Sequence, residues 1–478
     1  MKHTILKALG LAAVLALGIH SSAGAADQAS GKPNVVFILV DNSGWGDLAC
    51  YGGTTPTPRI DSIAKAGMRF TNYTVEAQCT PTRSAILSGR LPIRTGSSKV
   101  PLDDAPYGLC PWEYTMGNLF SDAGYATAAY GKWHVGDAGR YPTDHGFDEW
   151  AGIGHSSDEA GWTSYKEFRD LGLPAPQMYA GVKGQPTKAT GVFDLKAKSL
   201  MDEASVKRSV SFIEKQAAAK KPFFLYLSYT HIHPPMTVHP DFAGKSSAGM
   251  YSDTIMEIDH RTGQVLDALK AAGVEKDTIV VFSSDNAGAI MAGIPGASNG
   301  PWRGHFFTPP YEGSYRTYAM ISWPGHITAD KVSDGMLSAV DWLPTLAGLV
   351  GESKRVPTDR PIDGVNAADY MTGKSETTGR DHVLYFGTDA KLMSVKWRDW
   401  KVMFRKSDGI AEPITDVQLP IVYNLKNDPG ERSNLWEQQM DMAWVLRPAA
   451  AKIGAFMQSV AKYPNIKMGE DFKGYTGK

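Results

Sequence analysis

The segment VEAQCTPTRSAILSGR, at residues 75–90, places a cysteine at the mouth of an expected helix and an arginine about one turn further on. Thr80 is suited to cap this helix, and Gly89 is suited to end it. We therefore expect Cys79 to lie just outside the positive end of the helix dipole, where a negative charge is stabilised. Arg83 adds a permanent cation whose planar fork suits an oxyanion. The segment predicts a site that meets a negatively charged group.

Two Asp-Asn pairs, Asp41-Asn42 and Asp285-Asn286, each follow a continuous apolar run. If these runs are strands of an open α/β sheet, their carboxyl ends border the ligand crevice. Carboxylate and amide oxygens are hard ligands that suit Ca²⁺ or Mg²⁺ better than zinc. Either pair alone could simply cap a loop. Two pairs at equivalent strand ends favour a metal site.

Two further segments offer titratable side chains. In GKWHVG, an extended chain would place Lys132 and His134 on one face and Trp133 on the other, unless the segment is a solvated edge with a packed tryptophan. His231 and His233 share a face at strand spacing. They could form a zinc pair, or a catalytic acid beside a structural histidine. The oxygen ligands nearby favour the acid.

The elements that must position these residues can be read from the apolar periodicity. Runs at residues 33–40, 223–230 and 278–284 are typical of strands buried on both faces of a parallel sheet. Helical periods lie between them, at 205–219 and 253–272. Strands that alternate with helices predict an α/β fold with a mostly parallel sheet flanked by helices.

Near residue 375 the pattern changes to short strand-like segments separated by turn residues, which predicts an antiparallel sheet. These segments are 382–388, 391–397, 400–406 and 420–426, and a helical stretch follows at 440–461. We therefore expect a catalytic α/β domain over residues 26–373. A smaller C-terminal α+β subdomain would cover residues 374–478.

Composition and the first residues bound the class of protein. The 478 residues are 42% hydrophobic and 21% charged, with a formal net charge of −1, which argues against a nucleic-acid-binding or polybasic membrane-surface protein. Residues 1–25 have the positive, apolar and small-residue regions of a cleaved signal peptide; for a membrane anchor, the alternative, the apolar run is short. No later segment is long and apolar enough to span a bilayer. We expect a periplasmic or secreted enzyme.

Three cysteines are an odd number for an exported chain, which marks one of them as different in kind. Cys50 and Cys110 could form a disulfide, but the sequence alone does not establish the geometry that a disulfide needs. Whether these two cysteines form a disulfide or are free thiols stays open.

Six segments together resemble the type I sulfatases, the formylglycine-dependent arylsulfatase family of the alkaline phosphatase superfamily. CTPTR at residues 79–83, followed by LSGR, is similar to the family's C-x-P-x-R motif, and GYATAAYGKWHVG at 124–136 is similar to its second signature. The others are PNVVFILVDNSGWGDLACYGG at 33–53, HPP at 233–235, SSDN at 283–286 and YNLKNDPGERSNLW at 423–436. One such motif could arise by chance, whereas six in the expected order make a strong match.

The resemblance implies that a maturation enzyme oxidises Cys79 to formylglycine, whose hydrated aldehyde supplies the nucleophile. It also implies a Ca²⁺ ion, with Mg²⁺ as the alternative. The ligands would be Asp41, Asn42, Asp285 and Asn286, and the diol at position 79 would complete the set. The helix end, Arg83 and the metal would together make the diol oxygen a good alkoxide at neutral pH.

The resemblance assigns roles to three more residues. Lys132 would contact the sulfate or the diol. His233 would lie near the leaving-group oxygen. Together with a cation, it would protonate or stabilise that oxygen. After attack at sulfur, His134 would take a proton from the remaining hydroxyl, so that the aldehyde re-forms and sulfate leaves.

Two departures from the family's pattern stand out. The family commonly has Asp-Asp where this chain has Asp41-Asn42; the amide keeps the oxygen ligand but removes one negative charge, which should weaken metal binding. The family also commonly carries a substrate-facing lysine before YEGG, whereas GPWRGHFFTPPYEGS at residues 300–314 has none. Arg303 or His305 could replace this lysine, and the choice between them stays open.

The function that follows is a sulfuric ester hydrolase that releases inorganic sulfate from an aryl or carbohydrate sulfate ester. Two alternatives remain: a phosphonate monoester or phosphodiester hydrolase of the same fold, and a non-catalytic protein that binds sulfated glycans. The irregular, Gly-rich segment at 155–186 is expected to shape the pocket entrance and set specificity.

Overall fold

The structure is a computed structural model that describes residues 31–101, 106–290, 296–409 and 412–475. The expected signal peptide at residues 1–25 lies outside these residues. Across the described ranges, we find no helix with the length and apolar character needed to cross a membrane.

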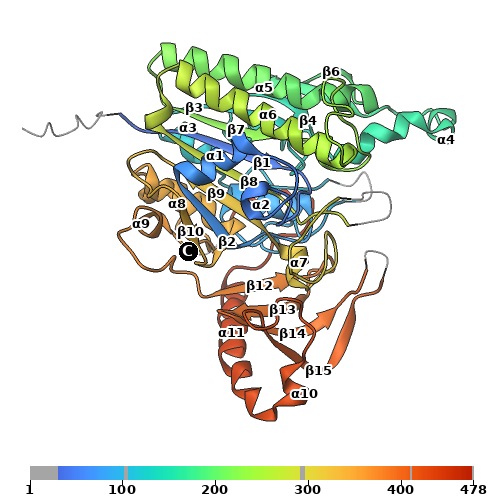
Figure 1. The fold of residues 1–478 in the computed structure, drawn as a ribbon, viewed down its shortest axis with the longest axis vertical. Coiled ribbons are helices and arrows are strands. Elements are labelled where there is room, and N and C mark those ends of the chain that lie inside the picture. Colours follow the sequence, from blue (N-terminus) through green and yellow to red (C-terminus); the bar gives the residue numbers. More distant parts are fainter. Residues whose placement is uncertain (1–30, 102–105, 291–295, 410–411, 476–478) are drawn as a thin grey trace, which may run out of the picture. The chain divides into compact units, whose positions relative to one another are not determined.

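A large mixed sheet forms the centre of the α/β part (Figure 1). Its strands are β1 (Asn34–Val40), β2 (Met68–Thr74), β3 (Ala126–Lys132), β4 (Glu149–Ile153), β5 (Gln177–Val182), β6 (Lys188–Val192), β7 (Phe223–Ser228), β8 (Thr278–Ser284), β9 (Arg316–Ser322), β10 (Lys331–Ser333) and β11 (Leu337–Ser338). The order is β10-β2-β9-β8-β1-β7-β3-β4-β5-β6, and β11 also pairs with β2. The central strands β8, β1, β7, β3 and β4 are parallel, and antiparallel pairs lie outside them. This confirms the predicted fold class.

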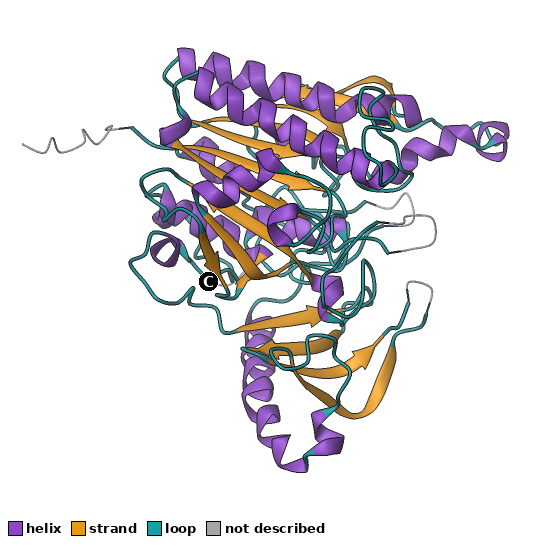
Figure 2. Cartoon of the chain, in the orientation of Figure 1, coloured by secondary structure: helices purple, strands orange, loops and turns teal. Residues whose placement is uncertain are grey.

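Helices cover both faces of this sheet, which explains why its central strands are buried and largely apolar. All residues of β1 are buried. On one face Phe37 joins a core shared with α2 (Cys79–Ser88), α3 (Met116–Asp122) and α8 (Trp342–Leu349). On the other, Ile38 joins a core shared with α1 (Pro58–Ala66), α5 (Leu195–Ala218) and α6 (Met250–Ala271). Figure 2 shows the two long helices α5 and α6 side by side along the sheet.

The predicted bounds in the α/β part lie close to those of the structure, with α6 beginning at Met250 rather than 253, and the start of α5 differs most. β8 covers the predicted residues, whereas β7 ends at Ser228 rather than 230. α5 begins at Leu195 instead of 205, because the Asp194 carboxylate accepts a hydrogen bond from the Ala197 N–H at 2.8 Å and caps an earlier turn.

The C-terminal part contains the expected antiparallel sheet, formed by β12 (His382–Phe386), β13 (Leu392–Trp397), β14 (Trp400–Lys406) and β15 (Thr415–Asn424) in that order. α11 (Leu446–Lys462) packs on it, and its predicted first residues form a separate 3₁₀ turn, η7 (Met440–Val445). The shorter helices are α4 (Lys166–Asp170), α7 (Glu312–Tyr315), α9 (Ala368–Met371), α10 (Leu435–Gln438), η1 (Ala49–Tyr51), η2 (Pro142–His145), η3 (Ser157–Ser164), η4 (Glu275–Asp277), η5 (Ala339–Asp341) and η6 (Ser353–Arg355).

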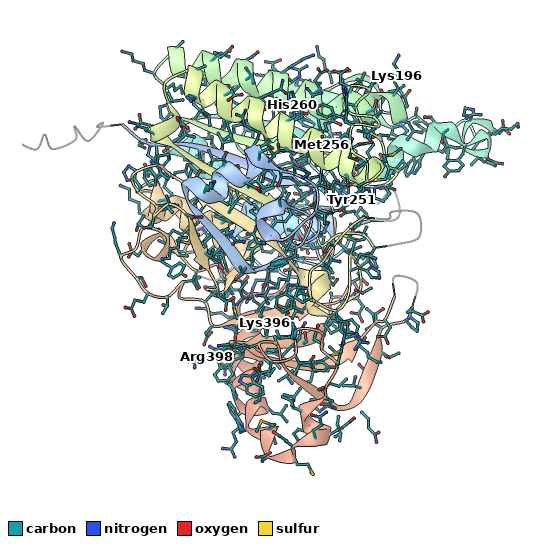
Figure 3. The ribbon with its side chains drawn as sticks, in the orientation of Figure 1. Lys196, Tyr251, Met256, His260, Lys396 and Arg398 are labelled. Atoms are coloured by element: carbon teal, nitrogen blue, oxygen red, sulfur yellow. The ribbon has the colours of Figure 1, made fainter. Side chains whose placement is uncertain are left out.

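A buried ionic cluster joins the two sheets. Glu312 of α7 accepts from Lys396 of β13, from Lys401 of β14 at 3.2 Å and from Arg316 of β9 at 3.3 Å. Figure 3 labels Lys396 where the two sheets meet. Residues Lys32–Lys478 form one compact unit, so the predicted boundary near Gly373 stays a prediction.

Candidate active site

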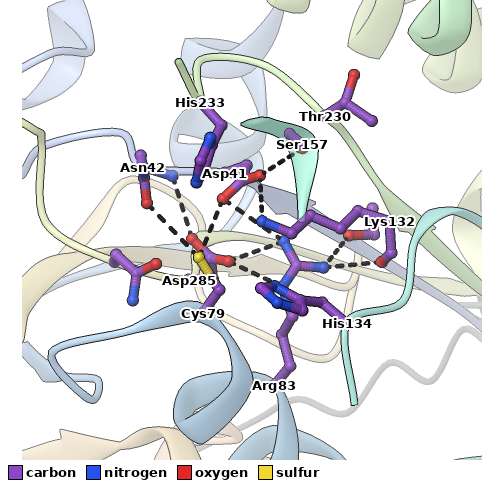
Figure 4. A network of polar contacts seen from close by, with 12 residues as sticks. Asp41, Asn42, Cys79, Arg83, Lys132, His134, Ser157, Thr230, His233 and Asp285 are labelled. Carbon is purple, nitrogen blue, oxygen red and sulfur yellow. Dashed lines mark hydrogen bonds and ion pairs between the residues drawn. The ribbon is translucent and has the colours of Figure 1, made fainter. Parts of the chain in front are cut away.

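The candidate site lies where four parallel strands end. Asp41 follows β1, Lys132 ends β3, His233 follows β7 and Asp285 follows β8. The amino end of α2 brings Cys79 to the same place (Figure 4). These segments are far apart in the sequence and meet because the carboxyl ends of parallel strands share one edge of the sheet.

Cys79 is the first residue of α2. The prediction that it lies just outside the helix is therefore wrong, because the helix begins at this residue. Gln78 occupies the cap position, and the Thr80 hydroxyl, expected as the cap, instead donates to the His134 carbonyl oxygen at 2.9 Å. Gly89 ends the helix as predicted, with φ of 69°. The Cys79 side chain still faces the site, because its Sγ lies 3.5 Å from Asp41 Oδ1.

The atoms around Cys79 have the chemistry of a metal site. Asn42 Oδ1 lies 3.9 Å from the Cys79 Sγ. One ligand atom each from Asp41, Cys79 and His233 lies within 4.8 Å of the other two. The buried Asn286 Oδ1 has no hydrogen-bond partner among the described residues, so an acceptor stands unsatisfied. A hard cation would satisfy these oxygens, and the predicted ligand residues therefore fit Ca²⁺ or Mg²⁺.

Arg83 and Asp285 form a buried pair beside this group. Arg83 Nε lies 2.8 Å from Asp285 Oδ2, and its Nη1 donates to the Lys132 carbonyl at 2.8 Å and to Ser228 Oγ at 2.6 Å. Burial and the nearby Asp41 carboxylate raise the pKa of Asp285 to about 6, against the effect of Arg83. A bound cation would favour the charged carboxylate.

Asp41 also holds Lys132 in place. Lys132 Nζ lies 2.7 Å from Asp41 Oδ2, and the Ser157 hydroxyl donates to the same oxygen at 3.1 Å. Burial opposes ionisation of Asp41, but Lys132, His233 and Arg83 hold the pKa of this carboxyl well below its usual range. Ser157, at the start of η3, was not predicted, since a lone serine in a loop carries no spacing signal.

His134 reaches the site by a different backbone path from the predicted extended one. β3 ends at Lys132, and His134 has φ of 57°, with its N–H donating to the Gly154 carbonyl at 3.0 Å. Trp133 packs in the core, as expected. The buried His134 Nδ1 has no hydrogen-bond partner among the described residues. Burial, with Lys132 and Arg83, holds the pKa of His134 well below its usual value, so the ring is neutral and can accept a proton.

The two histidines after β7 take separate positions. His231 Nδ1 lies 2.5 Å from Asp202 Oδ2 on α5, which favours the structural role over a zinc pair. His233 lies near Asp41 and Cys79, and burial lowers its pKa to about 4. Lys198, a fully buried lysine of α5, donates to the His233 carbonyl at 2.5 Å. Lys198 and Asp202 were not predicted, because they lie on the first turns of α5, which the apolar periodicity did not include.

Comparison with known proteins decides the family. The sulfatase family model matches residues 33–352, and the model for the C-terminal region of aryl-sulfatase matches residues 378–472. The chain belongs to the sulfatase family. It is a sulfate ester hydrolase, and the phosphorus-ester and non-catalytic alternatives are not favoured.

The sulfatase is similar to curated and solved proteins along most of its length. It is 30% identical over 475 residues to arylsulfatase G of Rattus norvegicus, covering 90% of this chain and 88% of that protein. It is 31% identical over 441 residues to N-acetylgalactosamine-6-sulfatase of Canis lupus familiaris, covering 84% and 81%. The crystal structure of PsFucS1 sulfatase from Pseudoalteromonas sp. matches with a TM-score of 0.84 and 30% identity, covering 92% of each chain.

Of the two residues that could replace the missing lysine, Arg303 is exposed and His305 is half-buried. Arg303 donates to the Glu431 carbonyl at 3.2 Å, pairs with Asp408 at 3.3 Å and covers the Tyr311 ring, which ties it to the C-terminal part. His305 Nδ1 contacts the Phe306 carbonyl at 2.9 Å. A substrate-binding role for either residue stays a prediction.

Cys50 and Cys110 of the sulfatase are both free thiols in the structure. Cys110 is buried, and Cys50 is half-buried. The structure therefore shows no disulfide between these two cysteines.

Proposed function

We propose that this sulfatase hydrolyses an aryl or carbohydrate sulfate ester with a formylglycine made from Cys79. The observation that carries the proposal is the position of Cys79, whose Sγ lies 3.5 Å from Asp41 Oδ1 at the amino end of α2. When position 79 carries the hydrated aldehyde, it supplies the oxygen that attacks sulfur. The helix end favours negative charge on that oxygen.

A divalent cation, Ca²⁺ or Mg²⁺, would be held by Asp41, Asn42, Asp285 and Asn286, and would supply positive charge beside the sulfate. The unsatisfied Asn286 Oδ1 and the all-oxygen side chains support this assignment. Calcium is the preferred assignment because Ca²⁺ accepts irregular sets of carboxylate and amide oxygens, whereas Mg²⁺ demands near-octahedral geometry.

The remaining residues bind the sulfate and move protons. Lys132, fixed by Asp41 Oδ2, presents a cation to the sulfate oxygens, where preorganised positive charge stabilises the transition state. His233 lies near Asp41 and Cys79, where it can serve the leaving-group oxygen. His134, neutral in its buried position, would accept a proton from the second hydroxyl of the diol, the one not bonded to sulfur, so that the aldehyde re-forms and sulfate leaves.

The substrate class and the location are part of the proposal. Two relatives bear the names arylsulfatase and N-acetylgalactosamine-6-sulfatase, which supports an aryl or sugar sulfate for this chain. The positive and apolar segments of residues 1–25 support export to the periplasm or the medium, with removal of those residues.

The test is to express the protein with and without a formylglycine-generating enzyme and to assay an aryl sulfate, sulfated sugars and an aryl phosphodiester. We expect mass spectrometry to find an aldehyde at position 79, sulfate release to require it, and a chelator to abolish activity. Cys79→Ala should be inactive, whereas Cys110→Ala should keep activity. Full activity with an intact Cys79 thiol, or faster turnover of the phosphodiester, would contradict the proposal.

A further inference from the structure

A cavity of about 410 Å³ opens beside His134, at the edge of the sheet where β3 and β4 end. Its wall includes Tyr107, His134, Asp137, His155, Glu159 and Trp162. We call it the side pocket. Its volume lies in the range of pockets that hold small ligands. Because His134 belongs to both the candidate site and the wall of the side pocket, the side pocket borders the site where the sulfate ester would bind.

The side pocket carries negative charge. Asp137, Asp158 and Glu159 line it, and no lysine or arginine appears among the described residues of its wall. Its one cation is His155, which contacts Asp137 and lies 3.1 Å from Glu159. Burial opposes protonation, but hydrogen bonds to Asp137 and Glu159 raise the pKa of His155 to about 10. Three carboxylates and one imidazolium leave an acidic pocket.

Aromatic side chains give the side pocket its apolar surface. The buried Tyr107 ring meets His134 edge-on at 6.3 Å and His155 at 5.7 Å between ring centroids. Trp162, which is 41% exposed, and the half-buried Tyr179 also line the side pocket. Carboxylates accept hydrogen bonds from hydroxyl groups, and aromatic rings pack on the apolar faces of rigid ligands. These groups suit a sugar.

The centre and the side pocket therefore have opposite charge. Lys132 and Arg83 favour one anion at the centre, whereas Asp158 and Glu159 repel a second anion next to it. We propose that the side pocket binds an uncharged, hydroxyl-rich sugar ring and selects sulfated sugars that carry no second anionic group on that ring. This inference rests on the proposed sulfatase reaction and adds the substrate class that the same site accepts.

The test compares kcat/KM for a singly sulfated neutral disaccharide with that for its counterparts carrying a second sulfate on either ring. We expect kcat/KM to be about tenfold lower for at least one doubly sulfated counterpart at low ionic strength. We call this difference the gap, and added salt should reduce it. Glu159→Gln and, separately, Asp137→Asn should reduce the gap several-fold. Glu214→Gln, on an exposed position of α5, is the matched control and should leave it unchanged.

A small aryl sulfate, which does not fill the side pocket, separates the two proposals. If the aryl sulfate is hydrolysed but every doubly sulfated sugar is cleaved as fast as the singly sulfated one, the side-pocket inference is overturned and the sulfatase mechanism stands. Loss of aryl sulfate turnover in the wild-type protein would instead count against the proposed function. An unchanged gap in both variants would also overturn the inference.

Discussion

Asp41 uses its two oxygens for different purposes. Oδ1 faces Cys79, and Oδ2 receives Lys132 and Ser157. One carboxylate therefore fixes both the lysine that we propose as the sulfate-binding cation and the oxygen that we propose as a metal ligand. Any change in its position moves both groups, so this residue couples substrate charge to metal charge.

Asn42→Asp tests the charge of the proposed metal ligands. The Asn42 Nδ2 has no hydrogen-bond partner among the described residues, so the substitution removes no such bond. We expect calcium affinity to rise by about tenfold, because each added ligand charge strengthens binding. The free energy of unfolding of the metal-free variant should be about 2 kcal/mol lower than that of the metal-free wild type, since a further buried carboxylate lies near Asp41 and Asp285.

Calcium titration and urea unfolding, with and without chelator, measure the two effects. Asn366→Asp is the control, because Asn366 is exposed and its Oδ1 acceptor is kept in the variant. Unchanged calcium affinity in Asn42→Asp would argue that Asn42 is not a ligand.

At the scale of elements, α5 supports the loop that carries His233. Lys198 donates to the carbonyls of His233 at 2.5 Å and Pro235 at 3.0 Å, and Asp202 receives His231. One helix thus anchors both sides of the segment that follows β7. This support holds the backbone around His233 in place.

Lys198→Met should lower kcat by about tenfold with little change in KM, because the loop that positions His233 loses its anchor. The loss should be smaller for an aryl sulfate with a good leaving group, whose oxygen depends less on a hydrogen bond from His233. Lys196→Met, at an exposed position of the same helix labelled in Figure 3, should have no effect. Equal losses with both leaving groups would indicate a general structural defect instead.

The strands were predictable, whereas the paths of the chain beyond them were not. β1 and β8 are buried on both faces, so their apolar runs determine them directly. His134 was expected on an extended chain, but its backbone turns at the end of β3 and its N–H bonds to Gly154. Such a turn depends on a partner that is distant in sequence.

The site residues divide in the same way. Asp41 and Asp285 follow strands of a parallel sheet, so their meeting could be predicted from topology. Ser157 contacts Asp41 from a 3₁₀ turn, and the Thr80 hydroxyl bonds to His134 instead of capping α2. Both contacts are tertiary, and local propensity contains no information about them.

At the scale of the whole molecule, the Glu312 cluster holds the C-terminal sheet against the α/β part. Burial opposes ionisation, but Lys396, Lys401 and Arg316 hold the pKa of Glu312 well below its usual range. The carboxylate is therefore charged at all physiological pH values, and its loss would leave three buried cations without their shared partner.

Glu312→Gln should lower the free energy of unfolding by about 3 kcal/mol, because Lys396 and Arg316 lose their buried carboxylate partner, whereas Lys401 keeps Glu431 at 3.0 Å. Urea unfolding measures the change. Glu376→Gln, at an exposed position, is expected to stay within about 0.5 kcal/mol of wild type. A loss below about 1 kcal/mol in Glu312→Gln would mean that other contacts hold the two sheets together.

His145 should make stability depend on pH. Burial lowers its pKa to about 4, while Nε2 contacts the Leu109 carbonyl at 3.1 Å. Because the unfolded state has the ordinary pKa of about 6.5, it binds more protons between pH 6.5 and 4, and stability falls as pH falls through this window. Because of this residue, the free energy of unfolding should fall by about 2 kcal/mol from pH 7 to pH 5.

Urea unfolding of wild type and His145→Gln at both pH values isolates this contribution, since other groups titrate in both proteins. The variant should lose about 2 kcal/mol less than wild type over the same interval. Parallel losses in the two proteins would show that His145 titrates normally in the native state.

The depth of Cys79 has a consequence for when the proposed conversion to formylglycine could take place. The residue is 2% exposed, and every residue of α2 is buried beneath the finished sheet. An oxidising enzyme would therefore have to meet the nascent or translocating chain before the strands assemble around that helix. Folded protein that still carries the thiol should resist later oxidation. If added enzyme converts Cys79 only after the protein has been unfolded, maturation must precede folding.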